Sequence, residues 1–313
     1  MRKKPILRRG ERKALALAFA AMVLSGCLSW FQRPKTDSGY GYAEVKGSDT
    51  MVNLAQAWAE AFMEQNEEAY ISVTGGGSGT GIAALINDDT DIAASSREIK
   101  EKELENARER GVVVWGFVVA IDGLAVAVNR KNPTENLTMK QLKQIFTGGI
   151  NDWSMLGWPD GGSISVYSRQ SNSGTYVFFN EHVMNDEDWA MGTKFLPGSA
   201  SINDAIKTDL AGIGYYGVGY LEGVKPLKIQ RDEGSEPVSP LDFENVSQGR
   251  YPLSRPLYLY VNGRPQGTVL EFLNFSFSED GQRLVVEEEY YPINKENMAQ
   301  NEGVLKEALG SAL

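Results

Sequence analysis

The sequence has very few of the side chains that support metal or thiol chemistry. It contains one cysteine, Cys27, and one histidine, His182, in 313 residues. A single cysteine excludes internal disulfides and cysteine-based metal sites. A transition-metal site would have to be built from carboxylates, and no spacing of the acidic residues suggests one. We therefore expect neither a bound metal nor another cofactor.

Basic charge and long apolar runs are also scarce. The formal net charge is −10, and an acidic protein is poorly suited to bind nucleic acid. Such a protein has to hold any anion by local dipoles and hydrogen bonds, because long-range attraction does not help. The apolar run at residues 14–24 is too short to cross a bilayer as a lasting helix.

The first 27 residues have the pattern of a signal peptide that is removed from the mature protein. Seven basic residues precede the apolar run, and Leu24-Ser25-Gly26-Cys27 ends it. This ending resembles the lipobox of bacterial lipoproteins, in which the cysteine is lipidated after cleavage. The resemblance implies an extracytoplasmic protein, periplasmic or on the outer surface, that is anchored to the membrane through Cys27. An ordinary signal peptide with an incidental cysteine is the alternative. Residues 28–39 then form a tether between lipid and domain.

Strand-like and helix-like patterns alternate from residue 40 onward. Apolar runs such as residues 70–73 and 91–94 are each followed by a segment with a helical pattern. This alternation predicts an α/β protein with largely parallel sheets. The chain that follows the signal peptide is long enough to form two lobes. Residues 138–146 and 294–313 are predicted to be helical, whereas residues 230–256 are polar and proline-bearing, as in a connector.

Serine or threonine stands in three segments where a strand ends and a helix begins: residues 48–50, 77–80 and 173–175. The first N–H groups of a helix have no intrahelical partner, so such a corner can bind an anion. Taken singly, each segment is better explained as an N-cap and a turn. Three of them in one chain, with Arg169 upstream of the third, favour an anion site, because a planar guanidinium matches a tetrahedral oxyanion.

The glycine-rich stretch at residues 75–81 does not match the common nucleotide or hydrolase motifs. A Walker loop needs lysine after its last glycine, where this chain has Ile82, and the G-x-G-x-x-G spacing is missing too. Thr80 stands where a G-x-S-x-G elbow needs glycine. A secreted phosphatase with Ser78 or Ser173 as nucleophile is the enzymatic alternative, but the lack of a second histidine or a metal cluster speaks against it. We predict that the protein catalyses no reaction.

Four segments together resemble the ligand segments of a known family: residues 47–51, 75–81, 91–97 and 167–175. In this order and spacing they look like the phosphate-binding protein of bacterial phosphate ABC transporters, and the similarity extends from about residue 44 to residue 260. The resemblance implies a receptor of the type 2 periplasmic-binding-protein fold that closes over one inorganic phosphate and delivers it to a membrane permease. We expect it to be a monomer.

The same resemblance implies a domain organisation and a set of ligand contacts. Each lobe is expected to be a mixed, mainly parallel sheet flanked by helices, with the ligand cleft between the lobes. Lobe 1 would comprise residues 40–128 and 257–313, and lobe 2 residues 129–256, so the chain crosses twice. By position, the phosphate contacts carry over to Thr50 and Met51 (backbone), Ser78, Ser96, Arg169, Ser173, Gly174 and Thr175. Arg169 is expected to contribute most.

One position departs from the family's pattern. There an aspartate follows the Asp-x-x-x-Ser strand and accepts a proton from bound phosphate, whereas here that position is Ser96. A carboxylate accepts from protonated phosphate and repels sulfate, but a serine hydroxyl accepts without repulsion. Asp122 or Asp49 could restore an acceptor, although a turn also explains Asp122 and a helix cap also explains Asp49. The rival ligands are therefore other tetrahedral oxyanions: sulfate, molybdate, tungstate or a phosphonate.

Overall fold

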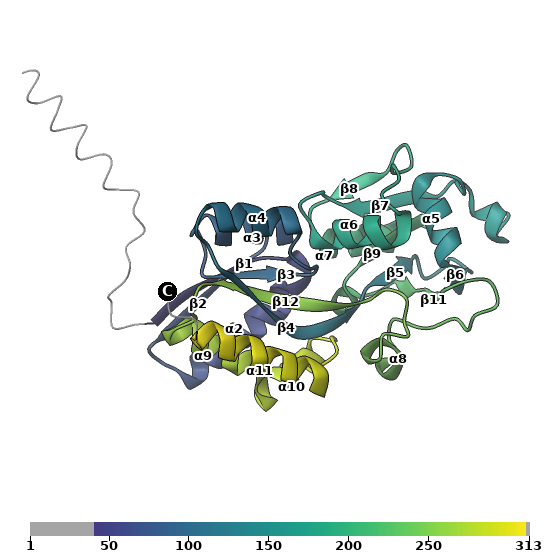
Figure 1. Ribbon diagram of the computed structural model, residues 1–313. Coiled ribbons are helices and arrows are strands. Elements are labelled where there is room, and N and C mark those ends of the chain that lie inside the picture. The colour runs from purple at the N-terminus through teal and green to yellow at the C-terminus, as the bar shows by residue number, and fades with distance from the viewer. Residues whose placement is uncertain (1–40, 311–313) are drawn as a thin grey trace, which may run out of the picture. The chain divides into compact units, whose positions relative to one another are not determined.

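The computed structural model describes residues 41–310, and Figure 1 shows their arrangement. The predicted signal peptide, the tether and Cys27 lie outside the described residues, as do residues 311–313. Two five-stranded sheets and one two-stranded sheet form the framework of the described part. The α/β class predicted from the strand–helix alternation is confirmed.

The first sheet comprises, in spatial order, β2 (Ala69–Thr74), β1 (Gly41–Gly47), β3 (Ile92–Ser95), β12 (Ser254–Asn262) and β4 (Val114–Gly123). Strand β1 is parallel to β2 and to β3, whereas β12 is antiparallel to β3 and to β4. Parallel neighbours cannot be joined by a tight turn, and the chain therefore passes through a helix after β1 and again after β2.

The second sheet comprises, in spatial order, β10 (Lys225–Pro226), β5 (Ala125–Val128), β9 (Gly212–Tyr216), β7 (Ser165–Arg169) and β8 (Lys194–Leu196). A separate pair joins β6 (Asn136–Thr138) to β11 (Lys228–Gln230). Within residues 41–310, each larger sheet combines two parallel with two antiparallel strand pairs. The sheets are mixed, as expected, but not mainly parallel, because β12 and β5 run against both of their neighbours.

Six helices of the described part belong to the first sheet: α2 (Val52–Gln65), α3 (Ser78–Ile86), α4 (Glu101–Glu109), α9 (Gly267–Phe277), α10 (Glu279–Glu287) and α11 (Lys295–Gly310). In Figure 1, α3 and α4 lie on one side of this sheet and the other four on the opposite side. The fully buried Trp58 of α2 donates from its indole nitrogen to the carbonyl of Gly281 in α10, at 2.8 Å. The helix predicted at residues 294–313 is confirmed as α11.

The helices near the second sheet are α5 (Met139–Thr147), α6 (Gly174–Phe179) and α7 (Ser199–Thr208). Helix α8 (Phe243–Ser247) lies in the connector and contacts β4 of the first sheet. Shorter helical turns are η1 (Asp49–Met51), η2 (Trp153–Leu156), the π-helical η3 (Asn180–Met184), which continues α6, and η4 (Val218–Tyr220). Among residues 41–310, none of the helices combines the length and the apolarity that crossing a membrane requires.

Helix α5 illustrates how local sequence sets an element. Thr138 caps it, because its hydroxyl accepts from the backbone N–H of Gln141 while the Gln141 side chain accepts from the Thr138 N–H. Leu142, Ile145 and Phe146 fall on one face and are buried. Gly148 ends the helix with a φ of 89°, a left-handed conformation that glycine adopts without strain.

The chain crosses between the two larger sheets at two places. It leaves β4 at Gly123 and enters β5 at Ala125, a few residues before the predicted lobe boundary at residue 128. It returns through the polar connector and enters β12 at Ser254. Because β4 and β12 pair directly, Asp122 faces Arg255 across the two crossing strands. This register places two ionisable side chains beside the junction of the sheets.

Candidate anion-binding site

Four residues predicted from the sequence to share a site have hydroxyl groups that lie together; we call Thr50, Ser78, Ser96 and Thr175 the hydroxyl cluster. Thr50 Oγ1 is 2.9 Å from Thr175 Oγ1, and Ser96 Oγ is 3.4 Å from Ser78 Oγ and 3.5 Å from Thr175 Oγ1. All four residues are fully buried. The first three follow β1, β2 and β3 of the first sheet, whereas Thr175 lies in α6, after β7 of the second. The cluster thus joins segments that follow strands of both sheets.

Gly174 lets the two sides of the hydroxyl cluster touch. A Cβ atom at this position would lie 2.3 Å from Ser78 Oγ and 2.8 Å from Ser96 Oγ, so no larger residue fits without a shift. Its neighbour Ser173 caps α6, with Oγ accepting from the N–H groups of Thr175 at 3.2 Å and Tyr176 at 3.4 Å. The capping and ligand interpretations of Ser173 are compatible, because the hydroxyl hydrogen is left for a ligand.

Arg169 ends β7 and is fully buried. Its Nη1 donates to Ser199 Oγ at 3.1 Å, and its Nη2 donates to Asp49 Oδ2 at 2.6 Å and to the Pro197 carbonyl at 2.9 Å. Burial lowers the pKa of the guanidinium, while the Asp49 charge acts in the opposite direction. A guanidinium carries five N–H donors and stays protonated in proteins. Its Nε is buried without a hydrogen-bond partner among the described residues, so the group retains donors for an anion.

Asp49 and Met51 lie in η1, directly after β1. Both Asp49 oxygens are engaged: Oδ1 accepts from the Gly76 N–H at 2.8 Å and Oδ2 accepts from Arg169. No side-chain hydrogen bond from Asp49 caps α2, whose N-cap is Met51. The Met51 N–H donates to the Ser48 carbonyl at 3.0 Å, so a ligand would have to share or replace that bond.

Sequence reasoning missed Arg255, which contacts the hydroxyl cluster directly. Its Nε and Nη2 donate to Asp122 Oδ2 at 2.9 and 2.7 Å, and Nη2 also donates to Thr175 Oγ1 at 3.0 Å. Asp122 is fully buried and its other oxygen accepts from the Val218 N–H at 3.0 Å. A signal did exist: strand alternation places Arg255 on the same face of β12 as the buried Leu257.

This arrangement can hold an oxyanion by hydrogen bonds. Hydroxyl groups and two buried guanidinium groups are strong donors, and each guanidinium is already balanced by its own carboxylate. An anion that binds here must replace the hydroxyl–hydroxyl contacts with contacts to its own oxygens. His182 contacts Phe178 and not the cluster in the described residues: its Nδ1 lies 3.0 Å from the Phe178 carbonyl and its ring stacks on the Phe178 ring. Within residues 41–310, no group of histidine, cysteine and acidic residues could hold a metal ion.

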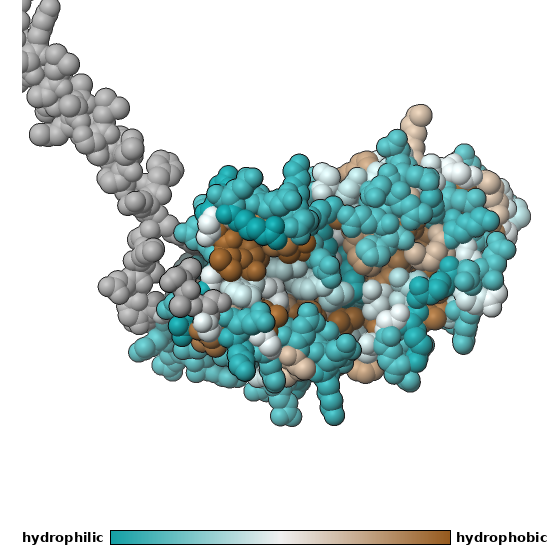
Figure 2. All heavy atoms as spheres, viewed as in Figure 1, coloured by the Kyte–Doolittle hydropathy of each residue, from teal (hydrophilic) through white to brown (hydrophobic). Residues whose placement is uncertain are grey.

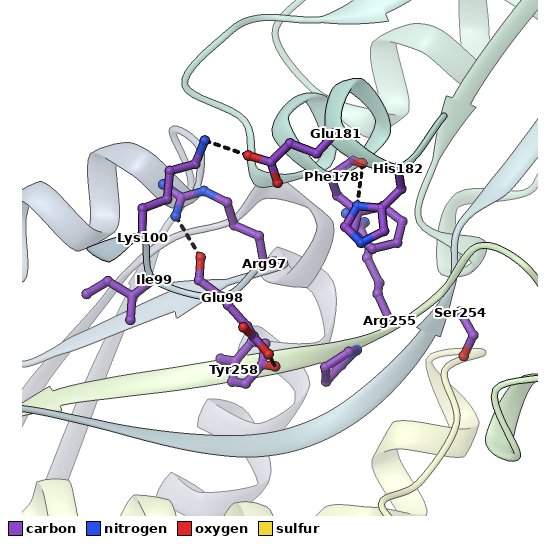
Figure 3. A pocket seen from close by; sticks show the side chains of 11 residues that line it. Arg97, Glu98, Ile99, Lys100, Phe178, Glu181, His182, Ser254, Arg255 and Tyr258 are labelled. Atoms are coloured by element: carbon purple, nitrogen blue, oxygen red, sulfur yellow. Dashed lines mark hydrogen bonds and ion pairs between the residues drawn. The ribbon is translucent and has the colours of Figure 1, made fainter. Parts of the chain in front are cut away.

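Figure 3 shows a cavity of about 430 Å³ in the same part of the molecule, with Arg255 in its lining. Its lining comes from the segment before α4, from α6 and η3, and from the start of β12, and it contains none of the four cluster residues. Arg255 connects the cavity with the hydroxyl cluster, because it lines the cavity and donates to Thr175. Across the cavity, Lys100 Nζ lies 2.7 Å from Glu181 Oε1, which joins the two sides (Figure 3).

Comparison with known proteins relates this chain to anion-binding receptors. Residues 33–280 match the family model described as a PBP superfamily domain. The phosphate-binding protein PstS of Pseudomonas aeruginosa is 33% identical over 264 residues, which cover 79% of this chain and 81% of that protein. The phosphate-binding protein PstS of Staphylococcus epidermidis is 32% identical over 254 residues, which cover 77% of this chain and 76% of the relative.

Solved structures show the same relationship in three dimensions. A Clostridium perfringens substrate-binding protein assigned to phosphate ABC transport, crystallised with bound phosphate, matches with a TM-score of 0.73 and 28% identity. The match covers 81% of this chain and 100% of that one. An ABC-type phosphate transport receptor from Vibrio cholerae matches with a TM-score of 0.64 and 29% identity, over 80% of this chain and 99% of the receptor.

Proposed function

Because this chain belongs to the periplasmic-binding-protein superfamily and, within it, to the phosphate-binding proteins of ABC transporters, we propose that it captures inorganic phosphate and delivers it to a membrane permease. Its fold is the two-lobed type 2 fold, with two mixed sheets flanked by helices. It is a binding protein and not an enzyme.

The observation that carries this proposal is the convergence of donors from both sheets on one buried point. Thr50, Ser78 and Ser96 approach from the first sheet and Thr175 from the second, while Arg169 of the second sheet is bonded to Asp49, the neighbour of Thr50. A ligand that contacts both sides stabilises the closed arrangement over an open one, which is the differential affinity that a hinge needs. The proposed phosphate contacts are those expected from the sequence: Thr50, Met51, Ser78, Ser96, Arg169, Ser173, Gly174 and Thr175.

The hinge of this proposal lies at the two crossings between the sheets. We take the two lobes as predicted, with the first boundary moved to the change of strand pairing between Gly123 and Ala125. The second boundary, predicted between residues 256 and 257, is likewise moved, to the start of β12 at Ser254. Rotation about these two crossings would separate the residues after β1, β2 and β3 from α6, and so open the hydroxyl cluster.

The acceptor for the proton of phosphate is proposed to be Ser96 Oγ. Neither Ser96 nor Thr50 receives a backbone or guanidinium N–H at its hydroxyl in the described residues, whereas Ser78 and Thr175 do. Asp122 and Asp49 remain the alternatives, but their oxygens are engaged by arginine and by backbone N–H groups. A hydroxyl acceptor does not repel sulfate, so discrimination between the two anions rests on hydrogen bonding.

The anchoring and localisation belong to the same proposal. The basic start, the short apolar run and Cys27 support cleavage and lipidation, which would hold the receptor on the extracytoplasmic side of a membrane. Replacing Cys27 by serine should move the protein from the membrane fraction to the soluble fraction.

The surface supports a monomer. On the face shown in Figure 2, hydrophilic residues cover most of the surface and hydrophobic residues are exposed in small groups.

Calorimetric titration of the purified protein with phosphate tests the ligand. Sulfate, molybdate, tungstate and a phosphonate should then be added as competitors at several pH values. We expect saturable phosphate binding that sulfate at equal concentration does not displace. Displacement by sulfate would instead make the protein a general oxyanion receptor, with specificity set by Ser96. In that case Ser96→Asp should restore discrimination, because the carboxylate repels sulfate. Failure of the wild-type protein to bind phosphate would contradict the proposal.

A further inference from the structure

We propose that Arg255 is a positioning residue for phosphate: it fixes the Thr175 hydroxyl as a donor to the bound anion, and Asp122 holds the guanidinium in place. This inference rests on the proposed phosphate-binding function and adds a residue to it. Arg255 lies on β12, outside the segments that carry the family resemblance, and none of those segments contains Asp122.

The guanidinium of Arg255 is held firmly. Its carboxylate partner Asp122 is its direct neighbour across the β4–β12 pairing, and the two residues are 2% and 0% exposed. Nε and Nη2 both donate to the same oxygen, and the remaining oxygen of Asp122 is fixed by the Val218 N–H. The guanidinium carbon also lies 5.3 Å from the centre of the Phe178 ring, within cation–π range. The direction of the remaining Nη2 hydrogen is therefore determined by the strands.

That hydrogen points at Thr175 Oγ1, 3.0 Å away on α6. A hydroxyl has one hydrogen and two lone pairs, so an oxygen that accepts from Arg255 must direct its own hydrogen elsewhere. In this structure the neighbouring oxygens are Thr50 Oγ1 and Ser96 Oγ. When an anion separates these groups, the hydrogen is directed to an anion oxygen. The positive charge behind Thr175 also makes its hydroxyl a stronger donor.

Other hydroxyls of the site are fixed in the same way. The Ser96 N–H donates to Ser78 Oγ at 3.1 Å, and the cap of α6 places two N–H groups on Ser173 Oγ. These donors are backbone groups, which any sequence supplies. Of the hydroxyls of Ser78, Ser173 and Thr175, only that of Thr175 accepts from a side-chain N–H group. This group belongs to Arg255, which lies on the other sheet. The position of Arg255 on the crossing strand β12 therefore decides that the Thr175 hydroxyl acts as a donor to the ligand.

A double-mutant cycle on phosphate affinity tests this role. The pair variant Asp122→Asn, Arg255→Met removes both buried charges together, so that neither is left alone. Thr175→Val removes the hydroxyl while keeping the shape of the side chain. The pair variant and Thr175→Val should each weaken phosphate binding about 10- to 100-fold, which is the equivalent of one hydrogen bond to a charged group. Combined with Thr175→Val, the pair variant should add no more than about a twofold loss.

Thr175→Ser is the matched control: it keeps the hydroxyl, so it should bind phosphate and remain sensitive to the pair variant. Equal losses from the pair variant with and without the Thr175 hydroxyl would overturn the inference, because Arg255 would then act independently of Thr175. If the pair variant does not fold, Arg255→Lys, which keeps the charge but not the fork, takes its place in the cycle. Absence of phosphate binding by the wild-type chain would overturn the proposed function and this inference with it, whereas wild-type binding with additive losses overturns only the inference.

Discussion

Arg169 Nη2 and Asp49 Oδ2 lie 2.6 Å apart, and this ion pair joins the end of β7 in the second sheet to η1 behind β1 in the first. The arginine is almost fully buried, whereas the Asp49 side chain keeps 22% of its surface exposed. The same carboxylate accepts from the Gly76 N–H. Asp49 thus orients Arg169, a proposed phosphate contact, and a glycine-rich loop at once.

Arg169→Ala should weaken phosphate binding by about 2–5 kcal/mol, the usual loss when a buried, hydrogen-bonded charge pair is broken. The substitution removes the proposed donors to the anion and leaves Asp49 Oδ2 without its guanidinium partner. Calorimetry provides the measurement, with Arg169→Lys as the matched variant that keeps charge but loses the planar fork. Near-wild-type affinity of the alanine variant would show that Arg169 is not a ligand.

Gly174→Ala should prevent full closure, because the new methyl group would lie 2.3 Å from Ser78 Oγ. The clash is between segments of different sheets, so each sheet can still fold. An overpacking cost of about 1–3 kcal/mol corresponds to a loss of phosphate affinity of roughly 5- to 150-fold. Titration gives the affinity, and small-angle scattering with saturating phosphate tests closure. Gly303→Ala, where the added carbon meets no atom within 4 Å, should change neither quantity.

The Lys100–Glu181 pair should contribute little to affinity, although it bridges the two sides of the cavity. The side chains are 47% and 41% exposed, and such pairs are worth about 0–1 kcal/mol. Lys100→Gln should therefore raise the phosphate Kd by no more than about fivefold, and less at high salt. The charge-swapped variant Lys100→Glu, Glu181→Lys should recover the difference. A tenfold or larger effect of Lys100→Gln would mean that the pair controls closure.

Glu103 should stabilise the fold above its pKa and not below it. Burial alone would raise that pKa, but hydrogen bonds from Arg97 and from the Lys100 N–H outweigh it and lower the pKa below its usual value. A lowered folded-state pKa contributes stability above the unfolded value, which is lost as the pH falls through the folded one. Glu103→Gln should cost about 1–2 kcal/mol near neutral pH.

Thermal unfolding of wild type and Glu103→Gln at several pH values measures this effect. The difference in Tm should shrink as the pH falls below the ordinary pKa of glutamate and through the lowered pKa of the folded state. The exposed Glu101, which pairs with Arg108, is the matched control, and Glu101→Gln should leave Tm almost unchanged. A Tm difference for Glu103→Gln that stays constant down to low pH would show that packing, and not charge, explains the role of Glu103.

Thr50, Ser78 and Thr175 of the hydroxyl cluster could be predicted from the sequence because each follows a strand and opens a helical segment, whereas Ser96 was expected only from the family resemblance. Parallel strands β1, β2 and β3 then bring Thr50, Ser78 and Ser96 to one edge without further information. Arg255 and Asp122 could not be paired in this way. They are 133 residues apart and meet through an antiparallel register that no local pattern specifies. The short strands β8 and β10 were likewise unpredictable, since two or three residues show no periodicity.

The pairing of each site arginine with its own carboxylate has a kinetic consequence. The pairs leave no excess positive charge at the site, and the chain as a whole carries a formal charge of −10. An approaching phosphate is therefore repelled at long range and attracted only after contact. Added salt screens that repulsion, over a Debye length of about 8 Å at physiological ionic strength. The association rate of phosphate should rise with ionic strength, the opposite of what electrostatic steering produces.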